Sequence, residues 1–516
     1  MSINREKNLI NVPAIFAILV FIFLASADIY SPSLYYDEVL FVNAAFGGES
    51  DLFIYKRILG IPVMLMPYIG ALKAWLYFPI FNFFSANQIT IRLPMILIGA
   101  ATLFINYCIV NKLFGRCAAT IFIILSAVEP STIFHTRIDW GPTTLMMFFR
   151  ALSILFLITF IQKRDIKYGI FFVLFTVVGI FDKANFIWIP VAIMLAYIFT
   201  SSIKLRIKII IYLLFILFLF SITFFTNEIA LPDFDKFQKN LNIFLMVLSG
   251  EDVFNFVTGR YIQGAYIQLC VVIFSFLVSM FAIMNLAVDG NLKKSITGIA
   301  VFSISIFCEI LVTRQANGPH HLAMLAPIWL IFISVGLNLI GNKKTNFRYA
   351  FFNGKGVSIL LFFLIMLSSL NVSNNYHEQL SKDVKHQWSV ALENLVTKTK
   401  NYSRQSKFIF VDWGGSTIFQ ALTQNQFTIY DFWPWFKDGF YGDKLRYFNS
   451  NFLSNEMYYV VPTSDYTNMA SSRENFIKMN SDNKWNLKPI DTIFDEKNMP
   501  AFEIYSTAIS DKLIPR

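Results

Sequence analysis

The first 371 residues alternate between long apolar runs and short polar segments. A helix needs about 20 mainly apolar residues to cross the hydrocarbon core of a bilayer. Eleven runs meet or approach this length, at residues 10–28, 93–111, 117–135, 141–161, 168–182, 185–200, 205–226, 263–287, 296–313, 320–340 and 356–371. The pattern therefore predicts an α-helical polytopic membrane domain over residues 1–371 with about 11 transmembrane helices.

Residues 29–91 separate the first two predicted spans. The stretch 58–84 within them is apolar, but it contains Pro62, Pro67, Pro79 and Lys73. A further crossing there would place every later loop on the wrong side for its charge. We therefore expect outer-face helices in this loop that lie along the membrane surface.

Basic residues set the expected orientation. They gather on alternate connections between the spans: Arg5, Lys7, Lys112, Arg116, Lys163, Arg164, Lys167, Lys204, Arg206, Lys208, Lys293, Lys294, Lys343, Lys344, Arg348 and Lys355. Cytoplasmic loops carry such an excess of lysine and arginine. We expect a multi-pass protein of the cell inner (plasma) membrane, with a cytoplasmic N-terminus and a periplasmic or extracellular C-terminal domain.

The remaining residues, 372–516, predict a soluble α/β domain. A polar amphipathic helix is expected over 377–400, and strands are expected at 407–411, 427–430, 457–461 and 502–505. Residues 412–415 form a predicted turn, and Ser416 is placed to cap the next helix. The turn lacks the GxGxxG pattern of a dinucleotide site.

Composition agrees with a membrane protein. Of 516 residues, 56% are hydrophobic and only 15% are charged, whereas soluble domains carry about 25% charged residues. Residues 372–516 hold 16 basic and 16 acidic side chains, so the net charge of +10 belongs to the membrane domain. This distribution excludes a soluble enzyme and gives no sign of a nucleic-acid partner. The four cysteines show no disulfide or zinc spacing.

Unusual polar residues fall on the predicted outer side. These are Asp37, Glu38, His135, Arg137, Asp139, Trp140, Asp182, Lys183, Arg314, His320 and His321. Ionisable groups at membrane level are costly and usually face a cavity. Carboxylates and cations at one rim suit acid–base work on an anionic, lipid-linked substrate.

Each group also has a plainer interpretation. Asp37 and Glu38 fit a solvated loop, and Asp182 and Lys183 fit an ordinary helical hairpin. The two histidines fit an interface between helices, and the Lys73 ammonium fits a position among lipid headgroups. A further pair of residues inside the spans, Glu129 and Arg150, predicts a structural ion pair.

Four stretches carry a resemblance to a known family: the pair Asp37–Glu38, the segment 68–75 with Ile91–Arg92–Leu93–Pro94, the segment 135–142 (HTRIDWGP) and the segment 181–185 (FDKAN). Over residues 10–200 the chain resembles the polytopic GT-C glycosyltransferases. Within them it is similar to the protein O-mannosyltransferases and the lipid A aminoarabinose transferases, the family 39-like group.

The resemblance implies transfer of a sugar from a polyprenyl-phosphate donor to a lipid, glycan or protein acceptor, with membrane lipids around the site. Asp37 matches the acid that deprotonates or orients the acceptor, with Glu38 beside it. Asp139 matches a second acid, which orients the acceptor or holds a divalent cation, Mg²⁺ or Mn²⁺. The implied phosphate ligands are Lys183, Lys73 and Arg92. The implied residues lining the donor and acceptor sites are Arg137, Trp140, Asp182, His320 and His321.

Two other functions stay open. One is a transporter or flippase for a lipid-linked sugar, although the sequence shows no paired halves of the kind that many transporters have. The other is a non-catalytic membrane scaffold whose outer domain binds a partner. Loss of Asp37 without loss of phenotype would favour the scaffold.

Overall fold

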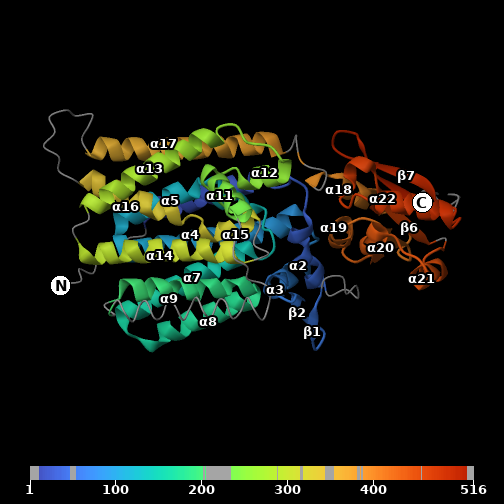
Figure 1. The fold of residues 1–516 in the computed structure, drawn as a ribbon, viewed down its shortest axis with the longest axis horizontal. Coiled ribbons are helices and arrows are strands. Elements are labelled where there is room, and N and C mark those ends of the chain that lie inside the picture. The colour runs from blue at the N-terminus through green and yellow to red at the C-terminus, as the bar shows by residue number, and fades with distance from the viewer. Residues whose placement is uncertain are drawn as a thin grey trace. The chain divides into compact units, whose positions relative to one another are not determined.

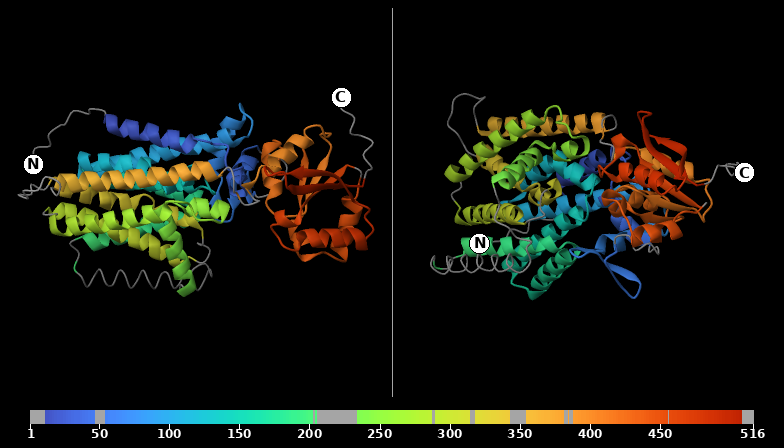
Figure 2. Two further views of the ribbon diagram at one scale, coloured as in Figure 1. Left: turned by 90° about the horizontal axis from the view of Figure 1, so that it is seen from above. Right: turned by 45° about the vertical axis from the view of Figure 1, so that its right-hand side comes forward.

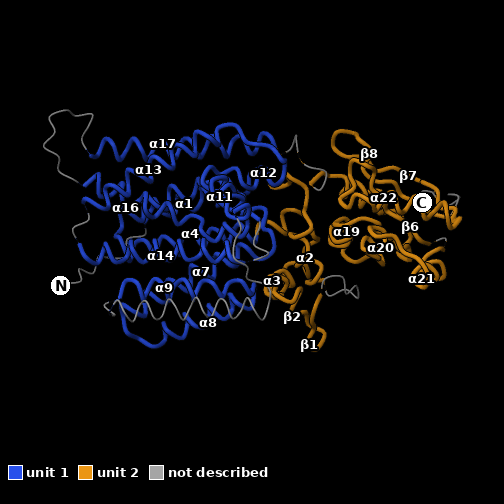
Figure 3. The backbone as a smooth tube through the Cα atoms, viewed as in Figure 1, with its two compact units in different colours: residues 1–28, 94–379 blue, residues 29–93, 380–516 orange. Residues whose placement is uncertain are grey.

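The computed structural model describes residues 11–46, 54–201, 204, 234–286, 289–313, 318–342, 354–380, 384, 388–454 and 456–507 (Figures 1 and 2). The chain forms two compact units (Figure 3). Unit 1 comprises residues 1–28 and 94–379, and unit 2 comprises residues 29–93 and 380–516. The division falls inside helix α4 (Gln88–Phe114), whose first residues belong to unit 2.

Unit 1 is helical. Besides most of α4 it contains α1 (Val12–Ser26), α5 (Arg116–Ala127), α6 (Pro130–Arg137), α7 (Thr143–Lys163), α8 (Ile166–Asp182), η1 (Ala184–Ile187), α9 (Trp188–Thr200), α11 (Phe234–Ser249), α12 (Asp252–Thr258), α13 (Ala265–Leu286), α14 (Gly290–Val312), α15 (Pro319–Leu322), η2 (Ala323–Leu325), α16 (Ile328–Asn342) and α17 (Gly354–Leu380). Within the described residues, six helical stretches are long and apolar enough to cross a membrane, and eight if each bent pair is one span.

Ten of the eleven predicted spans coincide with helices of unit 1. The eleventh, 205–226, lies outside the described residues. Two helices that the sequence did not predict, α11 and α12, follow it. The prediction of an α-helical polytopic membrane protein is confirmed.

Two bends shape unit 1. Helices α5 and α6 meet at 58° where Pro130 begins α6, and Glu129 caps α6 by accepting bonds from the backbone N–H groups of Ser131 and Thr132. Helices α11 and α12 meet at 110° around Gly250, which has a positive φ of 78°. A Cβ at Gly250 would lie 2.8 Å from the Pro130 ring, so the close approach of these bends requires glycine.

Glu129 and Arg150 do not form the predicted ion pair. The Arg150 guanidinium donates to the carbonyl oxygens of Met324 and Ala326, with 2.9 Å to the second. Both side chains instead satisfy backbone groups at helix ends, which are otherwise left without partners.

Unit 2 contains two sheets. The small one is antiparallel, in the order β1 (Lys56–Ile58), β2 (Ile61–Met66) and β3 (Ile69–Gly70), and is followed by α3 (Leu72–Phe81). Its β1–β2 turn is the pair Leu59–Gly60, both with positive φ, as two-residue hairpin loops favour. Surface helices were predicted within residues 58–84; α3 is such a helix, but the part that forms β2 and β3 was predicted wrongly.

The larger sheet has the order β5-β4-β6-β8-β7. Strands β4 (Lys407–Phe410), β5 (Thr428–Asp431) and β6 (Met457–Pro462) are parallel, and β7 (Lys488–Phe494) and β8 (Pro500–Ser506) complete it in antiparallel fashion. The helices beside it are α18 (Ala391–Thr399), α19 (Gly415–Leu422), α20 (Trp433–Asp438), α21 (Asp443–Asn451) and α22 (Ser472–Asp482), with the short turn η5 (Ser464–Tyr466). Figure 2 shows helices on both faces of this sheet.

Alternation along the strands explains the two covered faces. Ile409, Val411 and Tyr459 join an aromatic core that includes Phe436 and Phe448. The intervening residues of β4 face the other way, where the rings of Phe408 and Phe410 contact Phe419 of α19. The predicted α/β domain is confirmed.

Three local predictions in this region are wrong. Helix α17 continues to Leu380, beyond the boundary expected at residue 371. The helix expected over 377–400 is replaced by the end of α17 and by the short α18. Ser416 does not cap α19, because the N-cap is Gly414 in a left-handed conformation.

Residues 29–93 pack against the C-terminal domain within unit 2. The Tyr35 ring stacks on Trp388 at 4.3 Å, and the Asn43 amide donates to the Thr417 carbonyl oxygen at 2.9 Å. A Glu393 oxygen accepts bonds from Ser33 at 2.5 Å and Gln88 at 2.6 Å. Helix α2 (Tyr36–Phe46), which carries Asp37, is therefore fixed to α19 and α18.

Candidate functional site

The polar residues of unit 1 centre on the segment that joins α6 to α7. His135 Nε2 lies 2.5 Å from Asp252 Oδ2 of α12, and Ser131 donates to Asp252 Oδ1 at 2.6 Å. The Trp140 ring meets the His135 ring edge-on at 5.5 Å. All four of these side chains are buried.

A cavity opens beside this cluster, between α11, α12 and α15. Helices α12 and α15 lie at one end of the helical bundle (Figure 1). The space open to the centres of water-sized molecules is about 580 Å³, a volume typical of sites for small ligands. Its walls include Asp235, Lys239, Asn242, Asp252 and Asn255. Charged and amide side chains therefore line the cavity together with apolar residues such as Met246 and Phe256.

Lys183 is positioned by a close contact between α8 and η1. Its backbone is extended, which ends α8, and its carbonyl oxygen accepts a bond from Phe186 N–H at 2.8 Å. The Phe186 ring sits on Gly179, where a Cβ would lie only 2.6 Å from ring carbons. Glycine at this position thus lets the chain fold back and fixes Asp182 and Lys183 at the end of the hairpin.

The two histidines lie near Lys183. The His320 ring contacts Trp140 at 6.1 Å and His321 at 4.1 Å between centroids. His321 Nδ1 lies 3.4 Å from the Asn185 amide nitrogen. Electrostatic interactions link Lys183 to both histidines. The structure therefore brings Trp140, Lys183, His320 and His321 together, as the sequence led us to expect.

Two other predicted residues of unit 1 hold the backbone. Arg137 is fully buried and donates to the carbonyl oxygens of Ala27, at 2.9 Å, and Asp28. Asp139 accepts a bond from Thr144 N–H at 2.8 Å, which satisfies the first turn of α7. These contacts fix the end of α1 and the start of α7 around the cluster.

In unit 2, Glu38 and Arg92 form a buried ion pair. The Arg92 Nε lies 2.9 Å from Glu38 Oε1, and its Nη2 lies 3.0 Å from Oε2. The guanidinium also donates to the carbonyl oxygens of residues 29, 32 and 33. Glu38 in turn accepts from Tyr35 N–H at 3.1 Å, so the pair shapes the loop that leads into α2.

Asp37 follows Tyr35 and Tyr36 at the start of α2. Burial raises the pKa of both tyrosines, and the nearby Asp37 carboxylate raises the same pKa values further. Lys73 of α3 is buried in the same unit, with its ammonium 5.0 Å from the Phe41 ring and 5.8 Å from the Tyr77 ring. An ammonium over aromatic faces is stabilised by the ring quadrupoles.

The part of the chain that the structure describes brings together no evident set of metal ligands. Among the described residues, no group of three or more His, Cys, Asp or Glu side chains is placed to share an ion. One oxygen of Asp139 is already bonded to Thr144 N–H. We therefore derive no step through a metal.

Of the eleven site residues that the resemblance implies, four lie in unit 2, namely Asp37, Glu38, Lys73 and Arg92, and the other seven lie in unit 1. The sequence missed Asp252, which lies 117 residues from its partner His135. An available signal was the Ser249–Gly250–Glu251–Asp252 stretch, a polar break after an amphipathic segment. Arg314 lies outside the described residues.

Comparisons with known proteins agree with the resemblance seen in the sequence. The family model for dolichyl-phosphate-mannose-protein mannosyltransferase matches residues 67–224. A comparison with curated protein sequences finds no match.

Solved structures match over nearly the whole chain. ArnT from Cupriavidus metallidurans in the apo state has a TM-score of 0.59 and 10% identity, covering 95% of this chain and 97% of that one. The same protein bound to undecaprenyl phosphate has a TM-score of 0.58 and 10% identity, covering 96% and 98%. The oligosaccharyltransferase AglB from Archaeoglobus fulgidus, in complex with an inhibitory peptide and a dolichol-phosphate, has a TM-score of 0.55 and 10% identity, covering 98% and 74%.

These likenesses establish the fold. The protein is a multi-pass membrane protein with the GT-C fold, in which a helical membrane domain is followed by a mixed α/β domain. The predicted resemblance to GT-C glycosyltransferases is confirmed.

Proposed function

We propose that the protein is a membrane glycosyltransferase. It moves a hexosyl or pentosyl group from a polyprenyl-phosphate-linked donor to an acceptor at the outer face of the membrane. The observation that carries this proposal is the fold match over the full length of ArnT, a protein solved with undecaprenyl phosphate. The mannosyltransferase family match over residues 67–224 supports it.

The proposed reaction is a displacement at the anomeric carbon. An acceptor oxygen attacks that carbon, the bond from carbon to phosphate oxygen breaks, and the lipid phosphate leaves with the electron pair. The anomeric centre inverts. A hydroxyl is a weak nucleophile, so we assign Asp37 to take its proton in the transition state. Asp37 stands one residue beyond the buried pair Tyr35–Tyr36, whose packing fixes the start of α2.

The departing phosphate needs cationic partners. We assign this role to Lys183 and Lys73. Arg92 was a third candidate, but its guanidinium makes five hydrogen bonds to Glu38 and to backbone carbonyl oxygens. We therefore assign Arg92 and Glu38 to holding the loop that presents Asp37.

The polar cluster of unit 1 is a second candidate binding surface, within that unit alone. The cavity of about 580 Å³ is bounded by Asp252, which pairs with His135. We propose that the surfaces that bind the donor and the acceptor are formed or supported by Asp139, Trp140, Asp182, His320 and His321. Arg137 contributes by anchoring α1. A bound Mg²⁺ or Mn²⁺ ion stays a prediction from the resemblance.

We also propose the orientation predicted from the basic loops. The N-terminus is cytoplasmic, and the C-terminal α/β domain is outside the inner membrane. This arrangement places unit 2 in the compartment where lipid-linked sugars are used for envelope assembly.

The test compares two strains that lack the chromosomal gene. One carries the wild-type chain and the other carries Asp37→Asn, and mass spectrometry follows envelope lipids, glycans and surface proteins. We expect one sugar mass to disappear from one species in the Asp37→Asn strain, while its polyprenyl-phosphate sugar accumulates. The matched control is Asp28→Asn, an exposed acid in the same connection, which should behave as wild type. Full rescue by Asp37→Asn would refute the catalytic assignment.

A second variant tests donor binding. Lys183→Ala should weaken the binding of a polyprenyl-phosphate analogue more than that of the acceptor, because it removes a phosphate ligand. Unchanged affinity for the analogue would remove Lys183 from the donor site.

A further inference from the structure

Unit 2 contains a crevice at the carboxyl ends of β4 and β6. From β4 the chain passes through α19 to β5 on one side, and from β6 it passes through α22 to β7 on the other side. The connections thus run in opposite directions from the two neighbouring strands β4 and β6. In open α/β sheets, ligands bind outside the carboxyl ends of strands at such a switch point.

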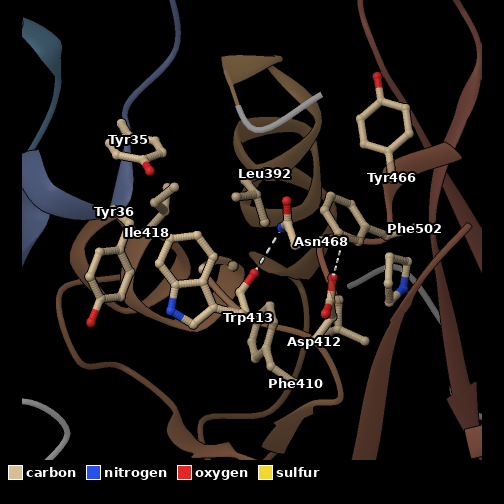
Figure 4. A pocket seen from close by; sticks show the side chains of 14 residues that line it. Tyr35, Tyr36, Leu392, Phe410, Asp412, Trp413, Ile418, Tyr466, Asn468 and Phe502 are labelled. Carbon is tan, nitrogen blue, oxygen red and sulfur yellow. Dashed lines mark hydrogen bonds between the residues drawn. The ribbon is translucent and has the colours of Figure 1, made fainter. Parts of the chain in front are cut away.

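The lining of this crevice is aromatic with a few polar groups (Figure 4). Trp413 follows β4, and its ring lies beside the Tyr36 ring at 4.9 Å with an angle of 35°. Tyr35 lies next to them, and Asn468 faces them from the segment after β6. Such a surface offers apolar faces together with hydroxyl, indole and amide groups that form hydrogen bonds.

The crevice is held in shape by Asp412. Its two oxygens accept bonds from the backbone N–H groups of Asn468, at 2.6 Å, and Met469, at 3.0 Å. The Asn468 amide donates to the Trp413 carbonyl oxygen at 2.9 Å. Gly414 adopts a φ of +95°, which lets the chain turn sharply behind Trp413. These contacts tie the segment after β6 to the segment after β4.

The crevice is shallow, so a bound ring would lie across its mouth and not inside it. The lining side chains surround about 500 Å³ when the mouth is included, but the space open to the centres of water-sized molecules is only about 40 Å³. None of the lining residues is lysine, arginine or histidine. The surface is therefore poorly suited to a phosphate or a nucleotide and well suited to a neutral ring that carries hydroxyl groups.

The crevice is linked directly to the proposed catalytic residue. Two of its lining residues, Tyr35 and Tyr36, immediately precede Asp37. Successive residues of a helix are only about 1.5 Å apart along its axis. The Asp37 carboxylate is also near enough to both tyrosines to raise the pKa values of their hydroxyls. The crevice and the proposed catalytic residue are therefore neighbours along the chain.

We propose that this crevice binds a neutral saccharide ring of the acceptor, and that the acceptor is consequently a glycan or glycolipid. The C–H face of the ring rests on Trp413 and Tyr36, and its hydroxyls bond to Asn468 and the tyrosine hydroxyls. That the bound saccharide is the acceptor rests on the proposed function, whereas saccharide binding as such rests on the crevice alone.

The experiment uses the full chain in lipid nanodiscs. Binding of a panel of neutral methyl glycosides is measured by saturation-transfer NMR and by tryptophan fluorescence, with sorbitol as an acyclic polyol and a serine/threonine peptide as competitors. We expect saturable binding of at least one cyclic glycoside, and none of sorbitol or the peptide. Binding of the peptide instead would overturn the proposal in favour of a protein acceptor. Absence of glycoside binding would overturn it outright.

Variants locate the site. Trp413→Ala should weaken glycoside binding at least about tenfold, the effect of losing a central aromatic contact. Trp413→Phe, which keeps an aromatic face in the same place, should weaken it by less, and this milder variant guards against a folding defect in the first. Tyr447→Ala is the control, because Tyr447 is an exposed aromatic residue of α21 outside the crevice. Equal binding by all four proteins would exclude the crevice.

A parallel assay separates the two proposals. If Asp37→Asn abolishes transfer while Trp413 variants bind and use the acceptor normally, the catalytic assignment holds and the saccharide site fails. If glycosides bind in a Trp413-dependent way while Asp37→Asn transfers normally, the saccharide site holds and the assignment of Asp37 fails.

Discussion

The buried pair Glu38–Arg92 gives the sharpest quantitative prediction. Both side chains are at most 1% exposed, and two parallel hydrogen bonds join them. Removing one partner of such a pair leaves an uncompensated buried charge, at a cost of about 3–5 kcal/mol. We expect Glu38→Gln to cost roughly 3 kcal/mol. Arg92→Met should cost roughly 5 kcal/mol, because three backbone carbonyl oxygens also lose their donor.

The double variant should cost less than the sum of the two. With neither charge present, roughly 5–6 kcal/mol is expected in place of about 8 kcal/mol, a coupling of about 2 kcal/mol or more. Hydrogen exchange measured on peptides from residues 29–46 reports the free energy of local opening. A loss of 3 kcal/mol appears as a fall of roughly 150-fold in protection.

An exposed ion pair provides the control. Asp443 and Arg446 of α21 are 92% and 81% exposed, so Asp443→Asn with Arg446→Met should leave protection unchanged. Additive costs for Glu38→Gln and Arg92→Met, together with lowered donor affinity in Arg92→Met, would refute the structural role. Arg92 would then return to the list of phosphate ligands.

Three further predictions concern unit 2 and the Lys183 hairpin. Burial, followed by the neighbouring Asp412 charge, raises the pKa of Asp431 to about 7. The folded state therefore holds this proton, and stability is lost as pH rises from about 4 to 7. Relative to the wild type, the free energy of unfolding of Asp431→Asn should rise by roughly 1–3 kcal/mol as the pH is raised from 4 to 8, after a discount for partial exposure. Thermal unfolding at several pH values measures this, and a stability difference between the two proteins that does not change with pH would contradict it. Gly179→Ala should cost about 1–3 kcal/mol through its clash with Phe186 and weaken donor binding, with partial recovery in Phe186→Leu; full activity of Gly179→Ala would show that the contact is dispensable. Leu59 at the β1–β2 turn is 97% exposed, and we expect it to enter the membrane surface. Brominated lipids should therefore quench the additional tryptophan fluorescence of Leu59→Trp relative to the wild type, and unchanged emission would argue against this.

The membrane helices could be predicted because each apolar run is a local signal. The same reasoning failed where apolar residues served another element. Strand β2 contains Pro62, and the turn between β1 and β2 is Leu59–Gly60 rather than the asparagine–glycine or aspartate–glycine pair that marks a hairpin. Without that marker, the apolar pattern of this segment resembled a surface helix. Helix α11 begins with Asp235, Lys236 and Lys239, whose charges hid it from a search for continuous apolar runs.

The candidate site was only partly accessible to sequence reasoning. Residue types that are unusual beside membrane spans drew attention to Lys183, His320 and Trp140, and the structure places them together. Their partners were not accessible, because Asp252 and His135 are far apart in the chain. Glu129 and Arg150 were matched by charge, but Glu129 bonds neighbouring backbone N–H groups and Arg150 bonds backbone carbonyl oxygens that are distant in the chain. Charge alone does not show which of several acceptors a buried side chain will choose.

Turnover by the purified protein tests the central claim most directly. The wild-type chain and Asp37→Asn are reconstituted in nanodiscs with a radiolabelled polyprenyl-phosphate sugar and an envelope glycan fraction, and transfer of label from the lipid is followed over time. The proposal predicts label transfer by the wild type and a rate about 10²–10⁴-fold lower for Asp37→Asn, the usual contribution of a positioned base, with donor affinity unchanged. Equal rates for the two proteins, or no transfer by the wild type from any such donor, would contradict it.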